Sequence, residues 1–489
     1  MHLPLRITTL ITLCSLLTLL TLSPSTYASS DLRNSIFKIH TTANQYNFLA
    51  PYQAPTQFEK TGTGFLIAGN KIITNAHVVN NNTQIQVRKS NDTKRYTATV
   101  QYIGEDCDLA ILTVKQPELF QDMVPLELGD MQTLQTPVTV YGFPVGGTEI
   151  TITEGVISRL QMIKYVNSGA ELLSYQIDAS VNPGASGGPV IANDKVVGVV
   201  HQVRTSGQNI NYAVPIEILK HFLKDTESGT YKGFPTWPRV YTQNTENTSL
   251  RKYFKLSPTE TGVRITQIAS DSYANSFLKP NDIIKTMDGV KIQNDGNIVY
   301  EKEFILPAYY LITKKYINDT VRLEILREGK SMTIDFPIKR SYLHDTELLR
   351  LTNARPKFYI LGGLVFEPYT NDYFTQAKGK ASKVSISATK ILNEIFTTEN
   401  VPKHVVLAHV LMDDINSGYV DLVHSIISKA NGKTIFTLED LIQAIESNTS
   451  ESHILTTDMG EDIIFYKNDL QEASKQIFDK YQIYADRYL

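Results

Sequence analysis

The feature that most constrains the fold is a series of short apolar runs between Phe37 and Val214, separated by Gly, Asn, Asp and Pro. The clearest runs are Gly64–Ile67, Lys71–Thr74, Thr83–Val87, Leu109–Leu112 and Pro137–Tyr141. Short strands at regular spacing, with turn residues between them, are typical of an all-β sandwich or barrel. Pro215–Asp225 has helical apolar spacing and starts with Pro, so we expect a helix to close this unit.

The rest of the chain divides into two further units. At 489 residues the chain is too long for one compact core, and about three domains are expected. Glu227–Pro238 is rich in Gly, Pro and Ser and is predicted to be a linker. A second unit from about Val240 contains a turn at Asp288-Gly289 and a strand at Thr320–Leu326, and a third begins near Phe358 and contains a helix at Leu438–Glu446.

The N-terminal segment has the pattern of a signal peptide. One basic residue, Arg6, precedes an apolar run of 16 residues, Ile7–Leu22, and a helix breaker with small residues ends at Ala28. The alternative is an uncleaved anchor, but the run is shorter than the roughly 20 residues that span a bilayer. Residues 1–28 are therefore predicted to be a signal peptide, and the location to be periplasmic, with secretion or membrane association as alternatives. The formal net charge of −3 gives no reason to expect a nucleic-acid partner.

The strongest candidate for chemistry is Ser186, in Asn-Pro-Gly-Ala-Ser-Gly-Gly-Pro-Val. Glycines on both sides allow a tight turn in which backbone N–H groups face a substrate. The N–H groups of Gly184 and Ser186 are the candidate oxyanion donors. A glycine-rich hairpin with an incidental serine is the alternative explanation of the motif.

A base and an acid precede this serine in the same β unit. His77 follows the apolar strand residues Ile72-Ile73, at a point where a loop can direct it. Asp108 heads the apolar run Leu109–Leu112, and a buried acid there needs a hydrogen-bond partner, which a histidine would provide. Asp106 and Glu105 compete for this role, but only Asp108 directly abuts the strand. The other histidines, His201 included, have no comparable setting and are interpreted as structural or surface residues.

These motifs resemble the active-site motifs of the HtrA/Deg family of serine proteases. TNAHVV, DLAIL and NPGASGGPV follow one another with spacings of 31 and 78 residues between His77, Asp108 and Ser186. Further matches are Gly62–Phe65, Tyr141–Pro144, Glu154–Ser158, Gln176–Ala179, Gly198–Val200 and Asn211–Pro215. One departure is Ala185, where the family often has Asn; it removes no essential atom, so activity is expected to survive.

The resemblance implies a mainly β fold: a chymotrypsin-like double β-barrel followed by two PDZ-like α+β domains. The expected domains are residues 29–230 for the protease, 231–342 for the first PDZ-like domain and 343–489 for the second. The later units are similar to the divergent PDZ domains of plant Deg-type proteases, through LKPNDIIKTMDGVKI, YILGGLVFEPYT and LMDDINSGY. In the first, Pro238 and Arg239 stand where a carboxylate-binding loop has small residues, so peptide capture is not expected there. Gly362 and Gly363 of the second are the better candidates for binding a peptide C-terminus.

The resemblance also implies the activity. The expected reaction is ATP-independent endopeptidase cleavage of unfolded or damaged envelope proteins, without metal or cofactor, in a homo-oligomer built from trimers. The residues expected to bind substrate are Val181, Asn182, Val199 and His201. Two alternatives remain: a non-enzymatic holdase or scaffold, and a cysteine enzyme that uses Cys107. The intact Ser-His-Asp set argues against the first, and the absence of a glycine-bracketed oxyanion site at Cys107 argues against the second.

Overall fold

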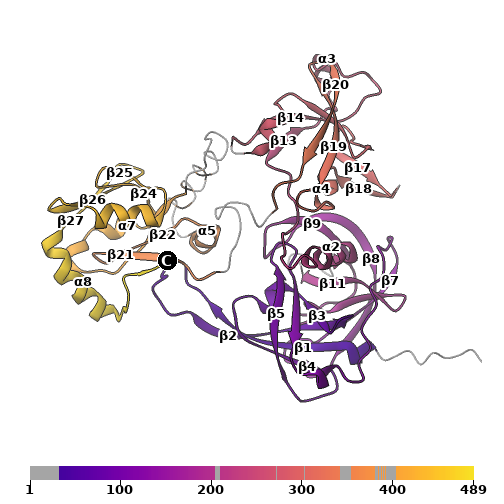
Figure 1. Ribbon diagram of the computed structural model, residues 1–489, viewed down its shortest axis with the longest axis horizontal. Helices are drawn as coiled ribbons and strands as arrows, with labels where there is room; N and C mark the ends of the chain where they lie inside the picture. The colour runs from indigo at the N-terminus through magenta and orange to yellow at the C-terminus, as the bar shows by residue number, and fades with distance from the viewer. Residues whose placement is uncertain are drawn as a thin grey trace, which may run out of the picture.

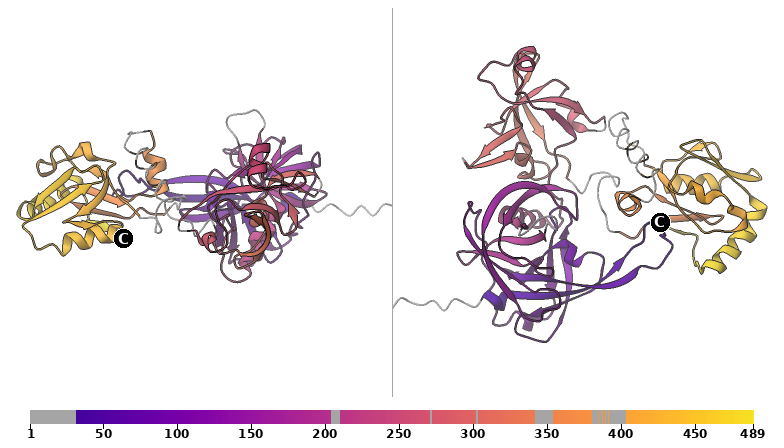
Figure 2. Two further views of the ribbon diagram at one scale, coloured as in Figure 1. Left: turned by 90° about the horizontal axis from the view of Figure 1, so that it is seen from above. Right: turned by 180° about the vertical axis from the view of Figure 1, so that it is seen from behind.

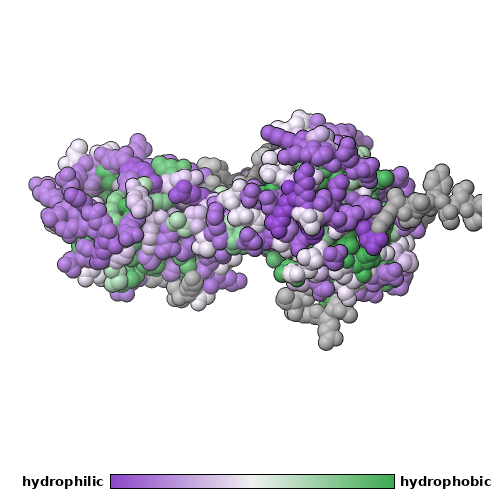
Figure 3. Space-filling model, turned by 90° about the horizontal axis from the view of Figure 1, so that it is seen from below, coloured by the Kyte–Doolittle hydropathy of each residue, from purple (hydrophilic) through white to green (hydrophobic). Residues whose placement is uncertain are grey.

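The computed structural model describes residues 32–203, 210–270, 272–301, 303–341, 354–379, 384, 387, 389, 391 and 403–489. The predicted signal peptide, residues 1–28, lies outside these described residues. Figure 1 shows three parts: a pair of barrels, a small β unit above them, and a C-terminal unit set to one side. In the space-filling view of Figure 3, the C-terminal lobe joins the remainder through a narrower waist.

Two closed six-stranded barrels form the first part, which confirms the predicted double β-barrel. The first barrel has the order β1-β2-β3-β6-β5-β4 and the second β10-β11-β12-β9-β8-β7. Strands of the first barrel are β1 (Ile36–Gln45), β2 (Thr56–Ile67), β3 (Lys71–Thr74), β4 (Asn82–Lys89), β5 (Tyr96–Gly104) and β6 (Leu109–Val114). Strands of the second are β7 (Pro137–Gly142), β8 (Thr151–Lys164), β9 (Glu171–Ile177), β10 (Pro189–Ala192), β11 (Lys195–Val203) and β12 (Asn211–Pro215).

Short helices connect and close the barrels. A single turn, α1 (Ala76–Val79), follows β3, and the 3₁₀ turns η1 (Leu32–Ser35) and η2 (Pro117–Phe120) lie at the edges. The predicted closing helix is confirmed as α2 (Ile216–Thr226), which starts directly after Pro215 and packs on β11 and β12. Its apolar face is buried, with Ile218, Leu219 and Phe222 at most 4% exposed, so burial of that face stabilises the helix.

The middle unit packs directly on the second barrel. Its main sheet contains β13 (Val240–Gln243), β14 (Val263–Ile268), β15 (Ile283–Met287), β16 (Val290–Lys291), β19 (Thr320–Arg327) and β20 (Lys330–Pro337). A separate hairpin has β17 (Asn297–Tyr300) and β18 (Phe304–Pro307), and the helical turns are α3 (Thr248–Tyr253), η3 (Tyr273–Ser276) and α4 (Tyr310–Thr313). One continuous apolar core runs from the second barrel into this sheet.

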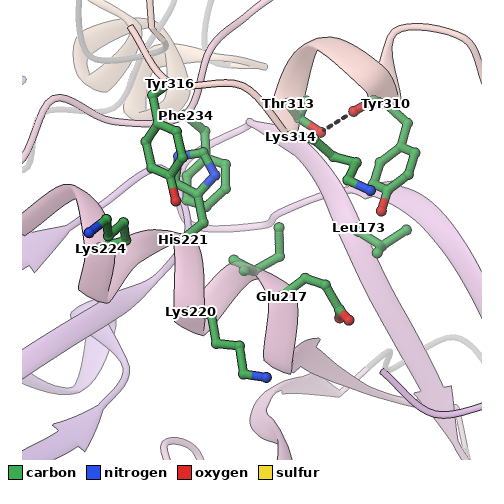
Figure 4. Close-up of a pocket in the computed structure, with 11 residues that line it drawn as sticks. Leu173, Glu217, Lys220, His221, Lys224, Phe234, Tyr310, Thr313, Lys314 and Tyr316 are labelled. Atoms are coloured by element: carbon green, nitrogen blue, oxygen red, sulfur yellow. Dashed lines mark hydrogen bonds between the residues drawn. The ribbon is translucent and has the colours of Figure 1, made fainter. Parts of the chain in front are cut away.

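The segment predicted to be a linker is anchored rather than free. Phe234 is fully buried, and its ring lies 4.1 Å from that of His221 on α2, centroid to centroid. On its other side His221 stacks on Tyr316 of the middle unit, also at 4.1 Å. Figure 4 shows this stack beside a cavity of about 350 Å³ between α2 and α4. An aromatic residue within a Gly- and Pro-rich segment therefore helps to fix how the middle unit sits on the second barrel.

The described part of the C-terminal unit is an eight-stranded sheet, with seven strands in one path and one short strand beside it, together with three α-helices. Its sheet order is β27-β26-β24-β23-β22-β21-β28, with β25 beside β24. The strands are β21 (Phe358–Leu361), β22 (Leu364–Pro368), β23 (Val405–Val410), β24 (Ile426–Ala430), β25 (Lys433–Thr434), β26 (Ser452–Thr457), β27 (Asp462–Tyr466) and β28 (Arg487–Tyr488). The helical elements are α5 (Asn371–Ala377), η5 (Asp414–Asn416), η6 (Tyr419–Leu422), α7 (Leu438–Glu446) and α8 (Lys467–Tyr481), and α7 matches the predicted helix.

A long hairpin links the first barrel to this distant unit. Strands β1 and β2 pair as far as Gln45 and Thr56, beyond the barrel wall, and Figure 2 shows them reaching the C-terminal unit in both views. At the tip, Phe48 joins an apolar cluster with Tyr369 and Tyr373. The C-terminal unit is therefore held by contacts far from it in sequence.

Candidate active site

The loop that carries Ser186 depends on a glycine, Gly184, for its backbone conformation. Gly184 has a φ of +97°, and a Cβ at this position would lie 2.4 Å from the carbonyl oxygen of Phe143, so only glycine fits. The neighbouring N–H groups of Ala185 and Gly187 bond to Asn182 O and Val200 O. Within the described part of the chain, the N–H groups of Gly184 and Ser186 bond to no acceptor. Two unused donors, one on the half-buried serine itself and one two residues before it, are the arrangement that an oxyanion requires.

His77 and Asp108 meet on the first barrel. His77 lies on α1, its Nδ1 is 2.6 Å from Asp108 Oδ2, and its backbone N–H donates to Asp108 Oδ1 at 2.8 Å. Asn75 Nδ2 donates to the carbonyl of Asp108 at 2.9 Å, which ties the loop before α1 to the head of β6. The His77 side chain is 27% exposed and Asp108 is 1% exposed, so the pair reaches solvent only through the imidazole.

The carboxylate of Asp108 is kept ionised by its surroundings. Burial alone would raise the pKa of Asp108, but the charge of His77 and hydrogen bonds from His201 and His77 outweigh burial and lower this pKa well below its usual value. The backbone φ of Asp108 is +53°, a left-handed conformation that Asp tolerates better than most residues. No hydrogen bond joins Ser186 Oγ to His77 Nε2 among the described residues; catalytic bonds of this kind often tighten only with substrate present.

The alternatives to Asp108 and Ser186 have other roles. Asp106 accepts from Tyr231 Oη at 2.6 Å and from the N–H of Phe234 at 2.7 Å, so its carboxylate anchors the segment after α2. Cys107 is fully buried, and burial raises the pKa of its thiol well above the usual value. A thiol that stays protonated in an apolar site is a poor nucleophile, so the structure favours the serine over the cysteine.

Two residues that sequence reasoning missed support this geometry. Thr63 on β2 is fully buried and contacts the serine loop through both backbone and side chain. Lys60, on the same strand, donates from Nζ to the carbonyl of His77 at 2.8 Å. The signal for Thr63 was present, because it lies within the matched Gly62–Phe65 segment, whereas nothing in the sequence marked Lys60.

Comparisons with known proteins agree with this geometry. The model of the family "Trypsin-like peptidase domain" matches residues 62–199, and that of the family "PDZ domain" matches residues 349–488. "Protease Do-like 4, mitochondrial" of Arabidopsis thaliana is 35% identical over 92% of this chain and 84% of its own length. This chain belongs to the Do-like (HtrA/Deg) family of serine proteases. It is a serine endopeptidase.

Two further relatives agree with this assignment. "Putative protease Do-like 3, mitochondrial", also from Arabidopsis thaliana, is 37% identical over 86% of this chain and 73% of its own length. A variant of the HtrA-type protease AlgW with a bound decapeptide has a TM-score of 0.50 at 19% identity, over 64% of this chain and 96% of that one. At 19% identity this likeness concerns the fold alone: the two chains share an overall fold.

The predicted periplasmic location of this Do-like protease is wrong. Both Arabidopsis relatives carry names that place them in mitochondria. The apolar N-terminal run was interpreted as a bacterial export signal, because N-terminal targeting segments for different compartments share basic and apolar character. Among the described residues, no helix is long and apolar enough to cross a membrane.

Two of the predicted substrate-binding side chains do not face a substrate. Val199 is fully buried in the apolar core of the second barrel, and His201 is 1% exposed and contacts Asp108. Strand β11 is buried along Val196–His201, so its side chains pack inside this Do-like protease. Val181 is half-buried and Asn182 exposed, both in the loop before Ser186, where a substrate can reach them.

The predicted carboxylate-binding glycines also need correction. Gly362 and Gly363 form the two-residue turn between β21 and β22, both with positive φ, as a tight hairpin requires. Asn416 Nδ2 donates to Gly362 O, and a Cβ at Gly363 would lie 2.5 Å from that nitrogen. The turn is buried, and β21 occupies the edge of β22 to which a PDZ domain would add a peptide. Peptide capture at this turn is therefore not expected.

Proposed function

We propose that this protease cleaves peptide bonds by acyl transfer, with Ser186 as nucleophile, His77 as general base and Asp108 as the group that orients His77. The observation that carries the proposal is the 2.6 Å contact between His77 Nδ1 and Asp108 Oδ2. A proton held on Nδ1 leaves Nε2 free to accept the proton of Ser186 as it attacks the carbonyl. Asp108 then stabilises the imidazolium, which gives its proton to the leaving amine as the peptide C–N bond breaks and the acyl-enzyme forms. His77 next takes a proton from water as the water attacks the ester, and the proton passes to Ser186 Oγ when the acyl group leaves as a carboxylic acid.

The oxyanion of the tetrahedral intermediate is assigned to the N–H groups of Gly184 and Ser186. Their lack of other acceptors supports this role, since the donors are in place before the reaction starts. Removing one such donor costs about 3–4 kcal/mol of transition-state stabilisation in comparable enzymes. The fixed left-handed conformation at Gly184 sets the direction of the first N–H.

Unfolded or damaged proteins are the proposed substrates, in protein quality control without ATP. An endopeptidase of this fold needs an extended segment in its cleft, and unfolded chains supply such segments. The decapeptide in the AlgW structure is consistent with a peptide-sized site in this fold. The mitochondrial names of the two relatives support an organellar location. Uptake of a reporter fused to residues 1–31 into isolated mitochondria tests it, and a reporter that stays outside would contradict it.

The two later units are proposed to act as PDZ-like domains, at 231–342 and 343–489, that support a homo-oligomer built from trimers. The shared core between the second barrel and the middle unit supports a structural role for that unit. Light scattering of the purified chain tests the oligomer: masses at multiples of three times 54.9 kDa are expected. A monomer at micromolar concentration would contradict the trimer.

Cleavage of one protein in folded and unfolded forms, without ATP, tests the proposed activity. The wild type should cleave only the unfolded form, and Ser186→Ala should not cleave it. Ser180→Ala is a matched control because Ser180 is an exposed serine before the same loop. A fluorophosphonate probe should label the wild type and Ser180→Ala at Ser186 alone. If Ser186→Ala cleaves at the wild-type rate, the assignment of the nucleophile fails; if both proteins only suppress aggregation, the chain is a holdase.

A further inference from the structure

A second histidine lies against the carboxylate of Asp108. His201 Nδ1 is 2.7 Å from Asp108 Oδ2, the same oxygen that His77 Nδ1 approaches at 2.6 Å. His201 comes from β11 of the second barrel, whereas Asp108 heads β6 of the first. The contact therefore crosses from one barrel to the other behind the proposed triad, on the side away from solvent.

The positions of the hydrogens in this cluster follow from which atoms can donate a hydrogen bond and which can only accept one. A carboxylate oxygen only accepts, so both Nδ1 atoms must carry hydrogen when Asp108 is ionised. His201 Nε2 is then an acceptor, and it is buried with no partner among the described residues. The ring of His201 stacks on that of Tyr165, with centroids 4.3 Å apart. Among the described residues, the only polar interaction of the His201 side chain is the one to Asp108.

We propose that His201 is a positioning residue for the protease reaction, whose Nδ1–H holds Asp108 in the orientation that directs His77 toward Ser186. The inference rests on the proposed roles of His77, Asp108 and Ser186. With His201 present, Asp108 accepts three bonds: two from His77, through its backbone and its ring, and one from His201. The bond from His201 restrains rotation about the Cβ–Cγ bond of Asp108, because it holds Oδ2 from the opposite barrel.

Packing alone gives a weaker account of a histidine at this position. An apolar ring would stack equally well on Tyr165 and would leave no buried nitrogen without a donor. Charged and titratable groups around the cluster are few: Lys60 beside His77, and Asp106, Cys107 and Tyr165 behind Asp108. Asp106 accepts from Tyr231 and, as a carboxylate, has no proton to donate, so the donor that Asp108 receives from this side is His201 Nδ1–H.

The experiment compares His201→Phe with His201→Asn in the full chain. Phe keeps a ring against Tyr165 but removes the donor, whereas the Asn amide places a donor close to the former Nδ1. For His201→Phe we expect kcat to fall about 10- to 100-fold at unchanged KM. The acidic limb of its pH–rate profile should move to higher pH, because a carboxylate with one donor fewer holds the His77 imidazolium more strongly. His201→Asn should stay within a few-fold of wild type, with its acidic limb in place.

A second measurement does not depend on activity. In the Ser186→Ala background, proton NMR should show two hydrogen-bonded imidazole N–H resonances downfield of the amides, one for each histidine on Asp108. His201→Asn should remove one of them and leave the other.

Each result bears on the inference. Equal losses in both His201 variants, without a shift of the acidic limb, would mean that His201 only packs, and an unchanged His201→Phe would equally overturn the inference. Failure of the proposed function looks different: the fluorophosphonate probe would then not label Ser186 in the wild type. This is measured first, before any His201 variant is made.

Discussion

Thr63 joins the two barrels at the loop that carries Ser186: its Oγ1 donates to the carbonyl of Gly184 at 2.8 Å. The same oxygen accepts the N–H of Phe143 at 2.9 Å, and the backbone N–H of Thr63 donates to Ser186 O at 2.9 Å. Thr63 lies on β2 of the first barrel, while Gly184 and Ser186 belong to the second. One fully buried side chain thus fixes the loop that presents both proposed oxyanion donors.

Thr63→Val should lower both stability and activity. Valine has nearly the same shape, but it leaves the buried Gly184 O and Phe143 N–H without partners, at about 1–3 kcal/mol each. The loop is then free to turn the Gly184 N–H away from the substrate, so kcat should fall at least about 10-fold. Thr63→Ser keeps the hydroxyl and should stay near wild type in kcat. Equal kcat values for the Val and Ser variants would show that the Thr63 hydroxyl does not position this loop.

The sequence predicted the barrels and the three motif residues, but not how they are supported. The apolar runs and turn residues of the first 215 residues are local signals, and local signals specify strands well. Lys60 and His201 act through contacts with residues 17 and 93 positions away, which no local pattern encodes. Gly362 and Gly363 were misinterpreted for the same reason: a glycine pair is needed equally by a binding loop and by a tight hairpin, and only the pairing of β21 with β22 distinguishes them.

Lys60→Met should loosen the turn that carries His77. Lys60 Nζ donates to His77 O at 2.8 Å, to Asn80 O at 3.0 Å and to Asn80 Oδ1 at 2.6 Å, so it ties the carbonyl of His77 to the C-cap residue of α1. Without these bonds we expect a loss of about 1–2 kcal/mol in the free energy of unfolding and a lower kcat. Lys115→Met, at an exposed lysine after β6, is the matched control and should change neither quantity. Urea unfolding and peptide cleavage measure the two effects.

His221 should make the protein less stable as the pH falls below neutrality. Burial between Phe234 and Tyr316 lowers the pKa of His221 to about 4, although Asp319 opposes the shift. Above pH 6.5 neither the folded nor the unfolded chain holds this proton, so stability is unaffected there. Between pH 6.5 and 4 the unfolded chain binds the proton and the folded chain does not, so the free energy of unfolding decreases. From pH 7 to 5 the loss is about 2 kcal/mol.

His221→Phe isolates this contribution, because phenylalanine keeps the aromatic stack but does not titrate. Another histidine, the half-buried His40, has a pKa lowered in the same direction, but it is present in both proteins and cancels in the difference. Urea unfolding from pH 7 to 5 should therefore show a smaller decrease in the variant than in the wild type. Parallel curves for the two proteins would mean that His221 does not titrate with unfolding in this range.

The hairpin tip should determine where the C-terminal unit sits. Phe48 is 7% exposed within the apolar cluster of that unit, and Gln376 bonds to the tip at both Phe48 N (3.0 Å) and Tyr46 O (3.1 Å). Phe48→Asp removes about 1.5–3 kcal/mol of apolar burial and places a charge in the contact, so the unit should separate from the tip. Small-angle scattering should then give a larger radius of gyration, and a protease should cut more readily between Gln45 and Thr56. Tyr253→Asp, at an aromatic residue that is 80% exposed on α3, controls for the added charge and should scatter like the wild type. If Phe48→Asp also scatters like the wild type, the C-terminal unit is held by contacts other than the hairpin.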